Sequence, residues 1–219
     1  MHQIVQNLVN IKKEINSHLS NQKNHKIPKI IAVSKTFGMD KIIPLIDYGH
    51  SDFGENKVQE AVEKWSNIKS NKNNIKLHLI GGLQTNKVKL AVKLFDYIHS
   101  VDSEKLAKKI SVEQQKQKKK VRVFIQVNIG NEGQKFGVDK LLVPELCSYC
   151  KTLNLEVVGL MCIPPLNEPS EIFFKEMSEM NKKLNLEELS MGMSSDYLNA
   201  IKNSATYVRI GSNIFGERN

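Results

Sequence analysis

The sequence lacks any apolar stretch long enough to cross a bilayer, and its longest apolar runs have the length of a strand, such as the one ending at Val33. It also lacks a secretory signal peptide. The N-terminal segment carries Ile4, Leu8, Ile11 and Ile15 at helical spacing, and charged residues among them interrupt any apolar signal core. These absences argue against a membrane partner and predict a soluble, cytoplasmic protein.

Cysteine is scarce, with three residues in the 219-residue chain. Cys147 and Cys150 form a single C-x-x-C pair inside a predicted helix that follows Pro144. A structural zinc site needs four ligands, and the sequence has no second pair. A thioredoxin-like pair would stand between a strand and the start of a helix. We therefore expect reduced, structural cysteines and no metal.

Acidic residues are outnumbered by basic ones, 23 against 32, which gives a formal net charge of +9. An excess of this kind sometimes marks a nucleic-acid partner. The lysines are scattered over the whole chain, however. The one dense basic run, residues 116–122, contains no aromatic residue and lies where a helix should end before a strand. We interpret the charge as compositional bias and expect no specific nucleic-acid partner.

No linker rich in proline, glycine and serine divides the chain, and its length suits one substantial core, so we predict a single domain over residues 1–219. Short apolar segments rich in Ile and Val alternate with amphipathic segments of helical period. The predicted strands are 29–34, 51–54, 76–80, 97–101, 121–127, 156–161, 188–191 and 207–210. The predicted helices are 4–19, 39–48, 55–65, 103–112, 144–153, 170–184 and 195–203.

Nearly continuous apolar strands are typical of a parallel sheet covered on both faces. Two folds fit the alternation, a (β/α)8 barrel and a doubly wound open sheet. Eight regular units favour the α/β class with a single (β/α)8 TIM-type barrel, in which the extra helix 4–19 covers one end. We expect Asp40 to cap the start of helix 39–48 and Gly49 to follow its end.

Functional groups of a barrel lie at the C-terminal ends of its strands. The first strand is followed by Lys35, and burying an ammonium group is costly, so this side chain either reaches solvent or has a function. Position alone favours the first interpretation, although partial burial would free a neutral amine to attack an aldehyde. Asn56, after the second strand, either contacts a ligand or caps a helix. His78, alone in the third strand, is expected to be a satisfied core residue.

The loops after the seventh and eighth strands are the places where barrels often bind phosphate. Met193 and Ser194 precede one helix, and Gly211 and Ser212 precede a short helical stretch. Glycine allows close approach of the backbone, and helix N-termini present N–H groups. The alternative is that both serines are only N-caps. Together with Arg209 and the strand-end lysine, these loops supply the groups needed to hold pyridoxal 5′-phosphate (PLP).

Seven blocks in fixed order along nearly the whole chain carry a resemblance to a known family. They are AVSK at 32–35, FGEN at 53–56 with QE at 59–60, HLIG at 78–81 with LQ at 83–84 and NK at 86–87, QVN at 126–128 with KFG at 135–137, GLM at 159–161, SMGMS at 190–194 with Asp196, and VRIG at 208–211 with IFG at 214–216 and Arg218. In these blocks the chain resembles the PLP-binding homeostasis proteins, also called proline synthase co-transcribed proteins. That family shares its fold with the N-terminal domain of alanine racemase.

The resemblance implies a cofactor site at the mouth of the barrel. In it Lys35 would carry PLP as a Schiff base, and the phosphate and the ring would be held by Ser194, Gly211 and Ser212, by Arg209 near the pyridine nitrogen, and by Asn56. Ser212 stands where the family often has threonine, which keeps the hydroxyl.

An arginine beside the pyridine nitrogen disfavours its protonation, and an unprotonated ring is a poorer electron sink. A racemase tolerates this with two bases, of which Lys35 would be one. In alanine racemase the other base comes from a further domain of a partner chain, which is absent from this sequence as it ends at Asn219. In this sequence Tyr48 or Tyr197 would have to serve as the second base, and no feature of the sequence particularly supports either.

We therefore expect a non-catalytic protein of vitamin B6 homeostasis that passes PLP to PLP-dependent apoenzymes. We also expect a monomer, because the absent domain is the one that builds the racemase dimer. The alternative is a small PLP-dependent amino-acid racemase.

Overall fold

The computed structural model describes residues 1–20, 26–72, 74–133 and 136–217. Lys135 and Arg218, which carry part of the resemblance, lie outside the described residues. The described part contains nine strands, all paired in parallel. They are β1 (Lys29–Val33), β2 (Asp52–Glu55), β3 (Lys76–Leu79), β4 (Tyr97–Val101), β5 (Arg122–Asn128), β6 (Val138–Asp139), β7 (Glu156–Cys162), β8 (Glu188–Ser190) and β9 (Tyr207–Ile210).

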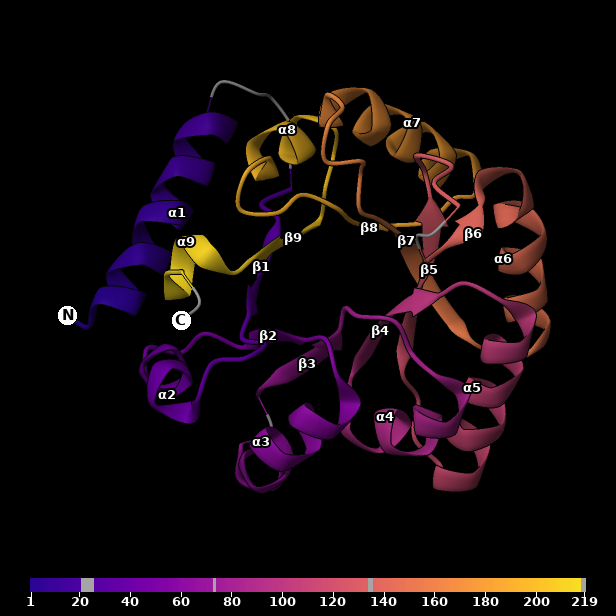
Figure 1. Cartoon of the computed structure of the whole chain (residues 1–219), viewed down its shortest axis with the longest axis horizontal. Helices are drawn as coiled ribbons and strands as arrows, with labels where there is room; N and C mark the ends of the chain where they lie inside the picture. Colours follow the sequence, from indigo (N-terminus) through magenta and orange to yellow (C-terminus); the bar gives the residue numbers. More distant parts are fainter. Residues whose placement is uncertain (21–25, 73, 134–135, 218–219) are drawn as a thin grey trace.

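Eight of these strands close into a barrel. They run in the order β4-β3-β2-β1-β9-β8-β7-β5, and β4 pairs with β5 to complete the ring. Figure 1 shows the ring surrounded by helices. The short β6, which the sequence did not predict, pairs only with the end of β5. The structure thus confirms the (β/α)8 TIM-type barrel and excludes the doubly wound open sheet.

Helices form the outer layer of the barrel. They are α1 (Gln3–Leu19), α2 (Met39–Asp47), α3 (Val58–Asn71), α4 (Val88–Leu94), α5 (Glu104–Gln117), α6 (Val143–Thr152), α7 (Ser170–Lys183), α8 (Tyr197–Lys202) and α9 (Ser212–Phe215), with 3₁₀ turns at Thr85–Lys87 and Lys140–Leu142. No helix in the described part of the chain is long and apolar enough to span a membrane.

The N-terminal helix α1 lies in the outer layer beside α2 and α9, so the expectation that it covers one end of the barrel was wrong (Figure 1). The helix after the last strand, α9, has four residues and cannot cover its side of the barrel. The predicted stripe of α1, from Ile4 to Ile15, is buried there. The amide of Asn7 donates to the carbonyl of Ile214 (2.9 Å), and the hydroxyl of Tyr197 donates to Glu14. Helix α1 therefore supports both C-terminal helices.

Two predicted helix starts also differ from the structure. The N-cap of α2 is Gly38, and Asp40 lies within the first turn, so its predicted capping role was wrong. Helix α3 begins at Val58, three residues later than predicted, because β2 continues to Glu55. Gly49 follows α2 at a φ of +94°, a conformation that favours glycine, as expected.

The interior of the barrel holds a separate cluster of large side chains, among them Tyr97, Phe124 and Tyr207. All three cysteines are free and buried, and burial raises the pKa of the Cys150 thiol to about 12, which disfavours the reactive thiolate. No group of three or more metal-binding side chains occurs within the described residues.

Candidate functional site

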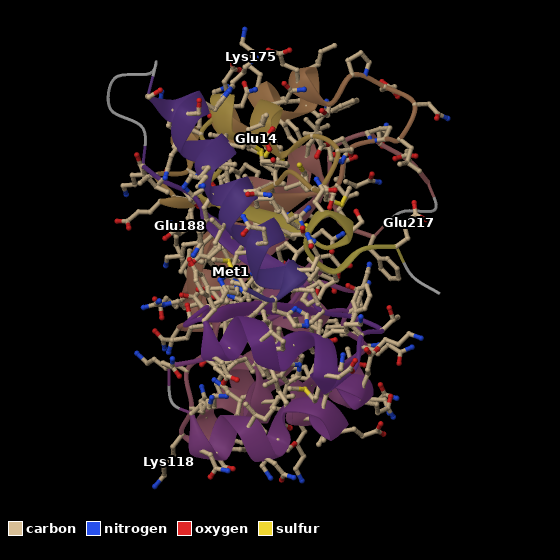
Figure 2. The ribbon with its side chains drawn as sticks, turned by 90° about the vertical axis from the view of Figure 1, so that its left-hand side faces the viewer. Met1, Glu14, Lys118, Lys175, Glu188 and Glu217 are labelled. Carbon is tan, nitrogen blue, oxygen red and sulfur yellow. The ribbon has the colours of Figure 1, made fainter. Side chains whose placement is uncertain are left out.

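A cavity of about 610 Å³ lies at the C-terminal end of the barrel strands. Figure 2 shows the two ends of the barrel on opposite sides of the view, with Glu188, at the start of β8, on one side and Glu217, a residue of the cavity wall, on the other. The structure brings together all seven residues predicted for the site, namely Lys35, Asn56, Met193, Ser194, Arg209, Gly211 and Ser212. The sequence did not identify Phe37, Ile80, Ile163, Ser195 and Gly216 as further parts of the wall.

Lys35 follows β1 and begins a tight turn. The carbonyl of Ser34 accepts from Phe37 N (3.1 Å) and from the ammonium group of Lys64 (2.9 Å). Thr36 has a φ of +69°, which is strained for a β-branched residue. Its amide donates to the carboxylate of Glu60 (2.7 Å). Lys35 is half-buried and lines the cavity.

A buried ion pair supports this turn from behind. Glu55 is fully buried, and its Oε1 accepts from Ser34 Oγ (2.8 Å), Lys64 Nζ (3.0 Å) and Trp65 Nε1 (2.9 Å). Lys64 Nζ also bonds Glu60 (3.0 Å). Burial would raise the pKa of the Glu60 carboxyl, but the bonds from Thr36 and Lys64 outweigh it and lower that pKa. The i, i+4 spacing of Glu60 and Lys64 on one helix is the sequence signal that could have indicated this ion pair.

The loops after β8 and β9 are tied together at the cavity. Ser194 Oγ accepts from Gly211 N (3.3 Å), and Asn213 Nδ2 donates to the carbonyl of Ser194 (3.0 Å). The N-cap of α8 is Asp196 and that of α9 is Gly211, so neither Ser194 nor Ser212 is an N-cap. The alternative that both serines only cap helices was therefore wrong.

Gly192 makes the bend before these loops possible. Its φ is +86°, and a Cβ there would lie 2.5 Å from the Cβ of Ala200. At Gly211 a Cβ would meet only Val33, at an ordinary contact distance of 3.5 Å. Packing within the protein therefore requires glycine at position 192 but not at position 211, where the missing side chain leaves the cavity wall open.

Arg209 projects from β9 and forms the inner part of the wall, with 4% of its surface exposed. Its Nη1 donates to Ser190 Oγ (2.8 Å) and its Nη2 to the carbonyl of Cys162 (2.8 Å). Burial lowers the pKa of Arg209, while Cys162 and Asp196 oppose the shift. Guanidinium groups remain charged in proteins, so the cavity contains a fixed cation.

The donor set fits a phosphorylated aldehyde such as PLP. Lys35 supplies an amine and Arg209 a cation, while Ser194 and Ser212 supply hydroxyls. The first helical bond of α9 comes from Ile214 N, so the backbone N–H groups that precede it lie outside the helical ladder and suit an anion. The volume is within the usual range for small-molecule sites.

The two tyrosines considered as a second base lie away from the cavity. Tyr48 is 47% exposed and packs under Lys12, and the hydroxyl of Tyr197 is bonded to Glu14 on α1. Of the described residues that line the cavity, none is a tyrosine, a histidine or a cysteine.

Comparisons with known proteins agree with this geometry. The sequence profile of the alanine racemase N-terminal domain matches residues 7–219. The pyridoxal phosphate homeostasis protein of Haemophilus influenzae is 36% identical, over 90% of this chain and 88% of that protein. The protein of the same name from Aquifex aeolicus is 39% identical over 87% of each chain. The structure of PipY from Synechococcus elongatus PCC7942 with PLP bound superposes with a TM-score of 0.86 and 30% identity, over 98% of this chain and 100% of that one.

Proposed function

The chain belongs to the family of pyridoxal phosphate homeostasis proteins, within the fold family of the alanine racemase N-terminal domain, and from this premise we propose that it binds PLP and acts in the homeostasis of vitamin B6. The observation that carries the proposal is the convergence of Lys35, Arg209 and the two serine loops on one cavity. The names of the relatives and the PLP bound to PipY support it.

We propose that Lys35 anchors the cofactor as a Schiff base. Bound PLP would supply an aldehyde to the Lys35 amine, the C=N bond would form with loss of water, and hydrolysis would release the cofactor again. The bonds from Glu60 and Lys64 to the turn hold the backbone at Lys35 in place during both directions.

The remaining wall would bind the rest of PLP. Ser194 and Ser212, with Gly211 and the start of α9, suit the phosphate, while Arg209 suits the pyridine nitrogen, with Asn56 and Met193 beside the ring. When bound, PLP supplies an electron sink, and a permanent cation at its ring nitrogen weakens that sink. The chain therefore acts as a reversible carrier and not as a catalyst.

The racemase alternative needs a second base on the face opposite Lys35. Among the described residues of the wall, the only titratable side chain besides Lys35 and Arg209 is that of Glu217, which is exposed. We expect no exchange of the α-hydrogen of D- or L-alanine with D₂O at turnover rates. Rapid exchange by the PLP-loaded protein would establish an enzyme instead.

Borohydride trapping tests the anchor. The purified protein is loaded with PLP, reduced with borohydride and digested, and the labelled peptide is sequenced by mass spectrometry. We expect the label on Lys35, and we expect Lys35→Ala to lose both the label and the visible absorption band. Lys57→Ala, which removes an exposed lysine next to Asn56 outside the wall, should keep both.

A label that persists in Lys35→Ala would show that another lysine is the anchor. A wild-type protein that binds no PLP at all would refute the proposed function.

We further propose that PLP-dependent apoenzymes receive the cofactor, and that the chain acts as a monomer in the cytoplasm. The test compares two samples with the same concentration of an apo-aminotransferase and the same total PLP. Transaminase activity should return faster in the sample where PLP is supplied by the loaded protein than in the one where it is free in buffer. Sedimentation should give a single species of about the chain mass of 24.9 kDa. Stable dimers would contradict the monomer.

A further inference from the structure

A chain of hydrogen bonds, buried except at its Asp52 end, crosses the inside of the barrel and ends on Arg209. It joins five residues of five strands, Asp52 on β2, His78 on β3, His99 on β4, Ser190 on β8 and Arg209 on β9. The distances are 3.1 Å from Asp52 Oδ1 to His78 Nε2, 3.0 Å from His78 Nδ1 to His99 Nε2, 3.0 Å from His99 Nδ1 to Ser190 Oγ, and 2.8 Å from Ser190 Oγ to Arg209 Nη1. Every link is of hydrogen-bond length.

Aromatic neighbours hold both imidazoles in this geometry. His78 stacks on Tyr97 with ring centroids 4.4 Å apart and planes 8° from parallel. His99 stacks on Phe124 at 4.2 Å and 20°. Both histidines are fully buried. Neither ring can turn without losing its stacking and two hydrogen bonds, so the chain is rigid.

The protons of the chain can be assigned by elimination. A guanidinium only donates, so Ser190 Oγ accepts from Arg209 and has its own proton to give to His99 Nδ1. His99 is then protonated on Nε2 and donates to His78 Nδ1, and His78 donates from Nε2 to the carboxylate of Asp52. Every link receives one proton while both imidazoles stay neutral.

The opposite direction of proton donation does not satisfy every hydrogen bond with both imidazoles neutral and Asp52 ionised. It needs a protonated Asp52 to donate to His78, and it gives Ser190 Oγ two donors with no use for its own proton in the chain. Burial lowers the pKa of both histidines. For His78 the bond that it donates to Asp52 opposes this shift, whereas His78 and Arg209 lower the pKa of His99 further. Burial would raise the pKa of Asp52, but the bonds from His78 and Ser51 leave it lowered. All these shifts favour neutral rings between an anion and a cation.

The anion at the far end of the chain matters because no ion pair joins Arg209 to a carboxylate among the described residues. A buried cation without a partner is costly. Asp52 retains 15% side-chain exposure and lines a different cavity, of about 330 Å³, beside the starts of β1 and β2. The chain thus runs from that cavity to the wall of the proposed cofactor site.

We propose that Ser190, His99 and His78 are positioning residues that, together with Asp52, orient the Arg209 guanidinium and hold it in place at the cofactor ring. The role at the ring rests on the proposed function, whereas the oriented chain itself is a property of the protein without PLP. The polarised chain fixes one amino group of Arg209, and the carbonyl of Cys162 fixes the other. The charge of Asp52 thereby acts on the cofactor site across the barrel.

NMR measurements on the protein without PLP test the hydrogen-bond chain. In ¹⁵N-labelled protein, the imidazole shifts of His78 and His99 should both show the neutral form protonated on Nε2. Arg209→Met and Asp52→Asn, at opposite ends of the chain, should each shift the signals of both rings. A His99 protonated on Nδ1, or signals that respond only to the nearer substitution, would overturn the oriented chain.

The PLP-loaded protein tests the positioning role. His99→Phe keeps a ring that can stack on Phe124 but removes both links. We expect it to weaken PLP binding about fivefold, as for residues of one hydrogen-bond network, and to shift the absorption maximum of the bound cofactor. In the Arg209→Met background the same substitution should change the affinity less than about twofold, because the residue to be positioned is gone.

Asp52→Asn keeps the size of the side chain and removes the charge, and it should shift the absorption maximum in the same direction as His99→Phe. His50→Gln is the matched control, since it removes a buried imidazole whose hydrogen bond, among the described residues, is to the backbone carbonyl of Asp52 and not to its carboxylate. It should leave the spectrum unchanged. Equal effects of His99→Phe in both backgrounds, or an unchanged spectrum in Asp52→Asn, would overturn the proposal. Absence of PLP binding in the wild type would instead refute the proposed function and leave the imidazole signals to decide on the chain.

Discussion

Replacing Lys64 by methionine tests whether the buried ion pair behind Lys35 holds the turn. Lys64 Nζ bonds the carbonyl of Ser34, Glu55 Oε1 and Glu60 Oε1 at 2.9 to 3.0 Å. Methionine keeps the length of the apolar stem and opens no large cavity. The substitution therefore removes the charge and its three bonds with little change in packing.

The magnitude follows from burial. The side chains of Lys64 and Glu55 are 10% and 0% exposed, and removing one partner of such a pair costs about 3 to 5 kcal/mol. Glu55 keeps the donors Ser34 and Trp65, which favours the lower end of that range. The bond to Glu60, which is 28% exposed, adds at most about 0.5 kcal/mol. We expect a loss of about 3 kcal/mol, a large part of the usual stability of a domain.

Urea unfolding followed by tryptophan fluorescence measures this loss. Trp65 is the single tryptophan and donates to Glu55, so it reports on the pair directly. With a slope of about 3 kcal/mol per molar urea, the midpoint should fall by about 1 M. Lys72→Met is the control: its partner Asp47 lies at 3.5 Å on the surface, and the midpoint should barely move. A loss below about 1 kcal/mol for Lys64→Met would refute the reasoning.

Two further predictions concern stability and the cavity wall. The free energy of unfolding should fall as the pH is lowered from about 6.5 toward 4. Burial lowers the pKa of His50 from 6.5 to about 4, so in this range the unfolded chain binds a proton that the folded one does not. Urea titrations at both pH values should show a smaller fall in His50→Gln, and an equal fall would exclude this contribution. Gly192→Ala should cost about 2 kcal/mol because of its positive φ and the contact with Ala200, whereas Gly211→Ala should keep the midpoint and weaken PLP binding, since its Cβ meets only ordinary contacts in the protein. Unaltered PLP affinity in Gly211→Ala would remove that residue from the proposed phosphate site.

The barrel was predictable because each strand carries its own signal. All eight predicted strands match strands of the structure to within one residue at each end, and the strand ends then indicated which loops meet at the cavity. The second strand was predicted to end at Gly54, one residue before its end in the structure, because Glu55 is a poor strand former. In the structure the Glu55 carboxylate is buried and accepts from Lys64, among other donors. Such a contact is tertiary, and no local pattern contains it.

The chain that ends on Arg209 was out of reach for a related reason. His78 was correctly predicted to be a satisfied core residue, but its partner His99 stands on the next strand and has no distinguishing neighbours in the sequence. The link between His99 and Ser190 spans 91 positions of sequence and joins β4 to β8, two strands that do not pair. Contacts across a barrel depend on register and tilt, which the sequence pattern does not determine.

The groups that support Lys35 and those that support Arg209 act on different parts of these residues, and this difference bears on whether the site binds a cofactor or catalyses a reaction. The support behind Lys35 holds the backbone of the turn, through the carbonyl of Ser34 and the amide of Thr36. The support behind Arg209 holds the side chain itself, at both amino groups. An amine on a fixed backbone beside a fixed cation suits repeated formation and hydrolysis of one bond. Carbanion chemistry would need the reverse, a proton held at the ring nitrogen and a second base on the wall.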